Sequence, residues 1–302
     1  MSLQRIFLPR HQRSAIDHQA ATGGTIVLEQ PSIALPRPAS VEVPKISLAR
    51  VSLSYRTNSG QPLAALANIN LDVRAREFLC IVGPSGCGKS TLLHLIAGLS
   101  RPSSGDVRAD GKPIRSTGTD RIVIFQDLGL FPWLTVRQNV EFGLKMKGAA
   151  RGEREAKARE YLRLVHLSQF ENSYTHQLSG GMRQRVALAR ALALEPDVLL
   201  MDEPFAALDA QTRDLLHDEL ERIWQETGCT IVFVTHNVRE AVRLGERVVL
   251  LTFRPGTTKQ EYSIRLARPR HIEQTDVAAA AREILECLRE EITRSRDAEY
   301  GK

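Results

Sequence analysis

The chain has 302 residues, of which 42% are hydrophobic and 25% are charged, the balance of an ordinary globular protein. Its apolar runs, such as DVLLM and TIVFV, last about five residues, far short of the roughly 20 that cross a bilayer, and no apolar stretch near its start indicates a secretory signal. The net charge of +6 arises from interleaved acids and bases and the four cysteines form no Cys-x-x-Cys pair, so neither a nucleic-acid surface nor a zinc site is indicated.

Residues 1–44 are predicted to form a flexible leader. They contain five of the fourteen prolines and show no sustained helical or strand period. From Lys45 the sequence KISLARVSLSY alternates apolar and polar residues as a half-buried strand does, so the folded domain is expected to begin there. Further strands are predicted for ANINLDV, EFLCIVG, GDVRADGKPI with its Asp-Gly turn, and RIVIFQ.

A helical insert is predicted at about residues 128–190, because TVRQNVEFGLKMKG and EREAKAREYLRLVHL carry apolar residues at helical spacing. After the insert, predicted helices and strands alternate. In chain order they are helix MRQRVALARALAL, strand DVLLMDEP, helix AQTRDLLHDELERIWQETG and strand TIVFVTH. Their nearly continuous Val, Ile and Leu runs are typical of parallel strands covered on both faces. A last helix in the extension 271–302 is expected to bury one stripe, formed by Val277, Ala281, Ile284, Leu288 and Ile292.

A glycine-rich loop follows the strand EFLCIVG directly and opens the helix STLLHLIAG. In this context its spacing predicts a phosphate-binding loop at a helix amino terminus, with a chance glycine-rich turn as the alternative. Lys89 is predicted to reach the β- and γ-phosphates, Ser90 to bind Mg²⁺ and Thr91 to add a hydroxyl contact. The loop consists of Gly83, Pro84, Ser85, Gly86, Cys87, Gly88, Lys89, Ser90 and Thr91. Because a helix amino terminus favours a thiolate, Cys87 is expected to react with alkylating agents unless ATP protects it, with an inert small residue as the alternative.

Two carboxylates end the strand DVLLMDEP, at the sheet edge where α/β proteins bind ligands. Asp202 is predicted to hold Mg²⁺ through water, completing the coordination that Ser90 begins. Glu203 is predicted to accept a proton from the attacking water. The alternative is that the pair merely begins a loop, but a phosphate loop in the same chain favours the catalytic interpretation.

The segment LSGGMRQR, residues 178–185, places a hydroxyl and two glycines at the start of a helix. Ser179, Gly180 and Gly181 therefore form a second candidate site for a γ-phosphate. This segment resembles the signature motif of ATP-binding cassette (ABC) proteins, a family that pairs two such domains head to tail. The resemblance implies that each signature closes on the ATP of the other subunit.

Other residues match the ABC family position by position. Tyr55 resembles the aromatic residue that stacks on adenine, with a half-buried strand tyrosine as the alternative. Gln126 is similar to the glutamine that contacts Mg²⁺ and the attacking water, Asp209 to an aspartate at the dimer contact, and His236 to the histidine that reads the γ-phosphate. The resemblance covers about residues 45–270. It implies an α/β fold, a P-loop NTPase of ABC type, with a mixed sheet core, an antiparallel β-subdomain and a helical insert subdomain.

Within the family, four segments resemble those of the branch that serves nitrate, sulfonate and taurine importers. They are VIFQDLGLFPWLTVRQNVEFGL, DEPFAALDAQTR, FRPGT and LARPR. Asn237 and Ala206 depart from the residues usual there, an aspartate and often a glycine. The branch implies an ATP-hydrolysing subunit that uses ATP and Mg²⁺, forms a homodimer and lies peripherally on the cytoplasmic face of the inner membrane. It also implies a membrane permease and an extracytoplasmic solute-binding protein as partners, and no nucleic acid.

The apolar loop from Leu128 to Leu134 is expected both to pack the helical insert and to receive a short coupling helix of that permease. A soluble ABC ATPase acting on ribosomes or DNA is the alternative function. It is disfavoured because the chain has one cassette and only about 90 residues, without sustained heptads, between Lys89 and Ser179. A kinase or GTPase would leave the signature and Asp209 without a role.

Overall fold

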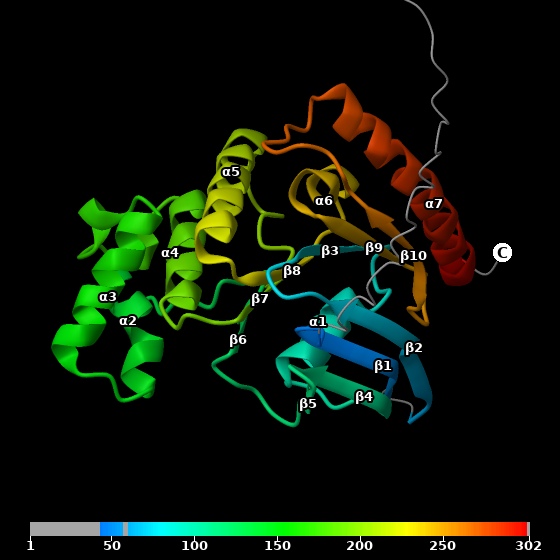
Figure 1. Cartoon of the computed structure of the whole chain (residues 1–302), viewed down its shortest axis with the longest axis horizontal. Helices are drawn as coiled ribbons and strands as arrows, with labels where there is room; N and C mark the ends of the chain where they lie inside the picture. Colours follow the sequence, from blue (N-terminus) through cyan, green and yellow to red (C-terminus); the bar gives the residue numbers. More distant parts are fainter. Residues whose placement is uncertain (1–42, 57–59, 301–302) are drawn as a thin grey trace, which may run out of the picture. The chain divides into compact units, whose positions relative to one another are not determined.

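The computed structural model describes residues 43–56 and 60–300, with side chains described to residue 297. Apart from its last two residues, the predicted leader 1–44 lies outside these ranges. The described residues form a six-stranded sheet, a four-stranded sheet and the helices that cover them (Figure 1). Within them, no helix is both long and apolar enough to cross a membrane.

The central sheet is built around β3 (Phe78–Val82), whose five residues are all apolar and buried. The other strands are β6 Arg121–Ile124, β7 Val198–Asp202, β8 Thr230–Val234, β9 Arg247–Leu251 and β10 Thr258–Ser263. Their order is β10-β9-β3-β8-β7-β6, and β10 alone runs antiparallel to its neighbour. The carboxyl ends of β3, β7 and β8 therefore meet at one edge, where sheets of this kind bind ligands.

A second, antiparallel sheet packs with α1 against one face of the central sheet. The elements are β1 Ile46–Arg56, β2 Pro62–Val73, α1 Lys89–Ala97, β4 Ser104–Ala109 and β5 Lys112–Pro113, with sheet order β2-β1-β4-β5. In β1 the predicted alternation buries Ile46, Leu48, Val51 and Leu53, with a shift of register after Leu48. These side chains, Leu93 of α1 and the alternate residues of β3 form one hydrophobic core.

Helices pack on the other face of the central sheet and beside its β6 edge. They are α2 Val136–Met146, α3 Arg151–Leu164, α4 Gly180–Leu192, α5 Ala210–Thr227, α6 Val238–Leu244 and α7 Thr275–Tyr300, with short 3₁₀ turns at Ser168–Phe170 and Thr175–Gln177. Figure 1 shows α2, α3 and α4 gathered beside the β6 edge. The predicted stripe of α7 is buried at Val277, Ala281, Ile284 and Leu288, whereas Ile292 is half-buried.

The expected mixed sheet, antiparallel sheet and helical insert are all present. The structure adds three elements that the sequence analysis did not predict, namely β9, β10 and α6. The strand β10 has the mostly polar sequence TKQEYS, and α6 has only seven residues. A mostly polar strand and a seven-residue helix carry too weak a hydrophobic period to be recognised, whereas the apolar run of β9, RVVLL, resembles those of β7 and β8 and could have been predicted.

Leu93→Ala is expected to destabilise the protein by about 2–5 kcal/mol, because Leu93 is fully buried in the core between the two sheets and its truncation leaves a cavity. Leu99→Ala is the matched control, since this side chain is 49% exposed just beyond the same helix and its loss is expected to cost about 0.5 kcal/mol or less. The free energies of unfolding are measured by equilibrium urea denaturation. Equal losses for the two variants would contradict the assigned core.

Candidate functional site

The loop between β3 and α1 closes around its own lysine. Gly86 and Gly88 have φ values of 72° and 100°, in the left-handed region that favours glycine. At Gly88 a Cβ atom would lie 2.7 Å from a side-chain carbon of β2, so no side chain fits there. Lys89 is 7% exposed, and its Nζ donates to the carbonyls of Gly83 (2.9 Å) and Pro84 (3.0 Å). The loop therefore has the strand, glycines, lysine and helix start that phosphate binding requires.

A cavity of about 310 Å³ lies on this loop. The loop and the first turn of α1 form one wall, Tyr55 and residues of β2 form another, and Glu203 and Arg254 complete the lining. The Tyr55 hydroxyl donates to the Thr91 hydroxyl at 3.3 Å, and the tyrosine is 43% exposed. Its ring is thus held at the cavity wall but remains accessible to a bound base. Arg254 was not among the predicted site residues, since FRPGT indicated only a branch of the family.

Glu203 and His236 follow the neighbouring strands β7 and β8 and contact each other. His236 Nδ1 lies 2.7 Å from Glu203 Oε2. Glu203 has a φ of 44°, an uncommon value for a residue with a side chain, and its N–H donates to the carbonyl of Val234 at 2.9 Å. Asp202, the last residue of β7, is half-buried at the same edge. The strand ends therefore present two carboxylates and an imidazole at the edge where the phosphate loop begins.

Buried polar side chains support this edge from behind. The Thr235 hydroxyl donates to Glu240, and Glu240 Oε1 lies 2.6 Å from His217 Nε2. Arg243 is 2% exposed, lies 3.3 Å from His217 Nδ1 and pairs with two aspartates of α5. These contacts connect α5 and α6 to Thr235, the residue that precedes His236. No sequence pattern indicates these contacts, because the residues are scattered along the chain and belong to no motif.

The signature residues form a separate group. Ser179 caps α4, its hydroxyl accepting a backbone N–H at 3.3 Å. A Cβ atom at Gly181 would lie 2.6 Å from Thr212 Cγ2, so α4 packs closely on the start of α5. Asp209 caps α5 by accepting the N–H of Thr212 at 3.0 Å, and this hydrogen bond lowers the pKa of its carboxyl. Ser179, Gly180, Gly181 and Asp209 therefore lie at adjoining helix starts, and none of them lines the phosphate-loop cavity.

The predicted metal ligands are Ser90, Asp202 and Gln126. Ser90 lines the cavity, whereas Asp202, half-buried at the end of β7, and Gln126, exposed two residues beyond β6, do not line it. In the part of the chain that the structure describes, no three His, Cys, Asp or Glu side chains are grouped so as to hold a metal ion. A hydroxyl and a carboxylate at the phosphate-loop edge fit Mg²⁺, which takes oxygen ligands and completes its shell with phosphate oxygens and water.

Cys87 does not have the environment that the sequence analysis expected. Its side chain is completely buried within the loop. Burial raises the pKa of its thiol, and the nearby ammonium of Lys89 only partly opposes this effect. The prediction of an accessible thiolate is therefore wrong, because desolvation outweighs the helix amino terminus.

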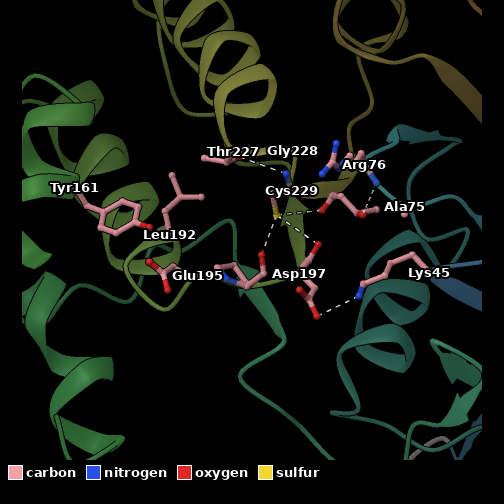
Figure 2. Close-up of a pocket in the computed structure, with 12 residues that line it drawn as sticks. Lys45, Ala75, Arg76, Tyr161, Leu192, Glu195, Asp197, Thr227, Gly228 and Cys229 are labelled. Atoms are coloured by element: carbon pink, nitrogen blue, oxygen red, sulfur yellow. Dashed lines mark hydrogen bonds and ion pairs between the residues drawn. The ribbon is translucent and has the colours of Figure 1, made fainter.

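A second cavity, of about 500 Å³, lies at the opposite, amino-terminal edge of the central sheet (Figure 2). Its lining includes Asp197 and Cys229, which directly precede β7 and β8. Lys45 pairs with Asp197 at 3.1 Å, Glu195 pairs with Lys157 at 2.8 Å, and burial raises the pKa of Cys229 to about 12. Lys45 and Arg76 balance the two carboxylates of this lining, and no glycine-rich loop opens a helix among the described residues there, so the cavity lacks the phosphate-binding loop of the first one.

A glycine-rich loop between a central parallel strand and a helix, with carboxylates on the neighbouring strand, defines a phosphate-loop nucleotide-binding protein. The family model described as ABC transporter matches residues 66–206. An uncharacterized ABC transporter ATP-binding protein of Methanocaldococcus jannaschii is 51% identical over 251 residues, which cover 83% of this chain and 94% of that protein. The chain belongs to the ABC transporter ATP-binding family.

More specific relatives are also similar. The nitrate import ATP-binding protein NrtD of Synechocystis sp. is 53% identical over 68% of this chain and 77% of its own length. The taurine import ATP-binding protein TauB of Burkholderia thailandensis is 48% identical over 74% of this chain and 86% of its own length. The dimeric post-hydrolysis structure of the ATP-binding cassette MJ0796, bound to ADP and Pi, has a TM-score of 0.65 and 36% identity, covering 74% of this chain and 100% of that one. The predicted family and fold class are confirmed, and the chain is an ATPase that binds ATP.

In the native protein Cys87 is expected to react with iodoacetamide at least about tenfold more slowly than the partly exposed Cys287, because attack requires an accessible thiolate. Because the pKa of Cys87 is raised, the small fraction of reactive thiolate grows with pH, and its slow rate of labelling is expected to increase as the pH rises. Peptide mass spectrometry after timed labelling at pH 8 measures both rates, and labelling in urea serves as the control in which both thiols react. Equal native rates would contradict the burial of Cys87.

Proposed function

We propose that this chain is the ATP-hydrolysing, energy-coupling subunit of an importer for nitrate, taurine, a sulfonate or a similar small anion. It acts as a peripheral protein on the cytoplasmic face of the inner membrane. Relatives named for nitrate and taurine import support this proposal. The observation that carries it is an exposed aromatic loop on the helical insert of a chain that also has a phosphate-loop cavity.

ATP binds in the phosphate-loop cavity. Its adenine stacks on Tyr55, a type of contact that contributes about 1–3 kcal/mol where bases stack on aromatic side chains. The backbone amides of residues 83–88 and the amino terminus of α1 bind the phosphates. Lys89, already held inside the loop, reaches the β- and γ-phosphates.

Hydrolysis uses the residues that follow β7 and β8. Glu203 accepts the proton of the attacking water, a role that contributes roughly 10²–10⁴ in rate. His236 Nδ1 orients that carboxylate at 2.7 Å, which leaves Nε2 for the γ-phosphate. Gln126 is assigned to the attacking water and to Mg²⁺ by family resemblance. Ser90 and, through water, Asp202 would hold a Mg²⁺ ion, which would supply neutralisation of the phosphate charge.

The signature motif binds the ATP of a second copy. Ser179, Gly180 and Gly181 lie outside this chain's own phosphate-loop cavity, so their phosphate must come from another molecule. A head-to-tail homodimer supplies it, with Asp209 at the same contact. The dimeric cassette with a similar fold supports this arrangement.

The loop 128–134 forms the surface for the permease. Trp133 is 70% exposed, and its ring lies 5.5 Å from that of Phe131, which packs at 4.4 Å on Phe142. Arg190 fixes the loop by donating to two of its carbonyls, at 2.5 and 2.7 Å, and a cavity of about 240 Å³ adjoins it. A rigidly supported, exposed Trp beside a cavity suits insertion of a partner helix. A multi-span permease and an extracytoplasmic solute-binding protein complete the proposed importer.

Trp133→Ala is expected to weaken binding to the permease by about 2 kcal/mol, roughly 30-fold, because aromatic anchors dominate protein interfaces. The ATPase rate of the isolated subunit is expected to stay within about twofold, since Trp133 is outside the nucleotide cavity. Tagged subunit is recovered from gently solubilised membranes, and the amount of co-purifying multi-span protein is quantified.

Met146→Ala is the matched control, because Met146 is 64% exposed on α2 of the same insert but lies outside the aromatic loop. Its recovery of permease is expected to equal that of the unmodified chain. Recovery of ribosomal or DNA-bound proteins with no membrane protein would contradict the importer proposal and favour the alternative function.

A further inference from the structure

The segment between β9 and β10, residues 252–257, is wedged against the phosphate loop. The carbonyl of Gly256 accepts the N–H of Ala67 at 3.0 Å, and its own N–H donates to the carbonyl of Ala65 at 2.9 Å. A Cβ atom at Gly256 would lie 2.1 Å from the carbonyl oxygen of Cys87. The segment is thus hydrogen-bonded to β2 and lies so close to the phosphate loop that no side chain fits at Gly256.

Arg254 projects from this segment into the nucleotide site. Its Nε donates to the carbonyl of Gly86 at 3.4 Å, and a Cβ atom at Gly86 would lie 3.0 Å from its Nη2. The side chain lines the phosphate-loop cavity and is exposed. Within residues 43–56 and 60–297, no carboxylate forms an ion pair with it. The guanidinium therefore retains donors for an anion at the very loop that binds phosphate.

Helix α7 holds this segment from the other side. Glu291 is 1% exposed and accepts the N–H of Phe253 at 2.9 Å and the ammonium of Lys259 at 2.9 Å. Burial acts to raise the pKa of Glu291, but these two hydrogen bonds and the positive charges of Lys259 and Arg294 together outweigh it and leave the pKa below its ordinary value. The carboxylate of the C-terminal helix thus anchors the residue immediately before Arg254.

We propose that Arg254 is a nucleotide-binding residue whose guanidinium contacts the phosphates, and that Glu291 is the positioning residue that aims it. A planar guanidinium with several donors matches phosphate oxygens, and its contact with Gly86 places it beside the phosphates rather than at a distant part of the nucleotide. The C-terminal helix thereby becomes part of the ATP site. The inference rests on the ATP-binding part of the proposed function and is independent of the permease.

The first test measures nucleotide affinity by isothermal titration with a non-hydrolysable ATP analogue, ADP and AMP. Arg254→Ala is expected to weaken binding of the ATP analogue about tenfold, as for loss of a charge-assisted hydrogen bond, and of AMP less than about twofold. Arg254→Lys keeps the charge but loses the planar set of donors, so an intermediate loss of about threefold is expected. Arg265→Ala removes the same charge from an exposed position outside the cavity and is the control, expected to bind like the unmodified chain.

A purely structural role for Arg254 predicts a different pattern. If the side chain only braced the loop, all three nucleotides would lose affinity equally and the thermal midpoint would fall. Equal losses, or no loss, would overturn the inference. An error in the proposed ATP site would give a different result from an error in the role of Arg254. In that case the unmodified chain would not bind the ATP analogue, or Lys89→Ala would leave binding unchanged.

The second test is a double-mutant cycle between the segment and the helix. Glu291→Gln is expected to weaken binding of the ATP analogue about threefold, and adding it to Arg254→Ala is expected to cause no further loss, since both changes act through the same contact. Glu290→Gln is the control, because Glu290 also pairs with Lys259, at 2.6 Å, but does not contact Phe253. Additive losses for Glu291→Gln and Arg254→Ala would overturn the positioning role.

Discussion

The central position of β3 is the constraint on which the rest of the site depends. It pairs with β8 through Ile81 and Val234, and with β9 through Val82 and Leu250. This register brings the exits of neighbouring strands to one edge, so the phosphate loop, the residues after β7 and the segment after β9 line one cavity. All five residues of β3 are buried, so the loop starts from a strand packed on both faces.

Much of this site could be predicted wherever a motif follows directly on an apolar strand. The phosphate loop follows β3, Asp202 ends β7 and Glu203 follows it, so the local pattern defines both the strand and its polar end. Arg254 could not be predicted in the same way, because its contact with Gly86 joins residues 168 positions apart. That contact depends on the segment between β9 and β10, and the mostly polar sequence of β10 carries a weak period.

Cys87 shows how a local rule fails when two effects compete. Its position at a helix start indicated a thiolate, but the fold encloses the side chain completely and desolvation prevails. The polar network of Glu240, His217 and Arg243 was missed for a related reason, since its members meet only when α5 and α6 pack. Sequence patterns therefore predicted which groups the site contains better than they predicted how buried each group is.

The central claim is that two copies of this chain share each ATP between the phosphate loop of one and the signature of the other. Light scattering after size-exclusion chromatography of Glu203→Gln, with and without ATP, tests it most directly, because slow hydrolysis preserves the ATP-bound state. ATP is predicted to convert monomers of Glu203→Gln to dimers. Adding Ser179→Asp is predicted to prevent dimer formation while each monomer still binds ATP. The aspartate can still cap α4, but its negative charge repels the γ-phosphate of the other copy. Dimers that form without ATP, or that persist with Ser179→Asp, would contradict the account.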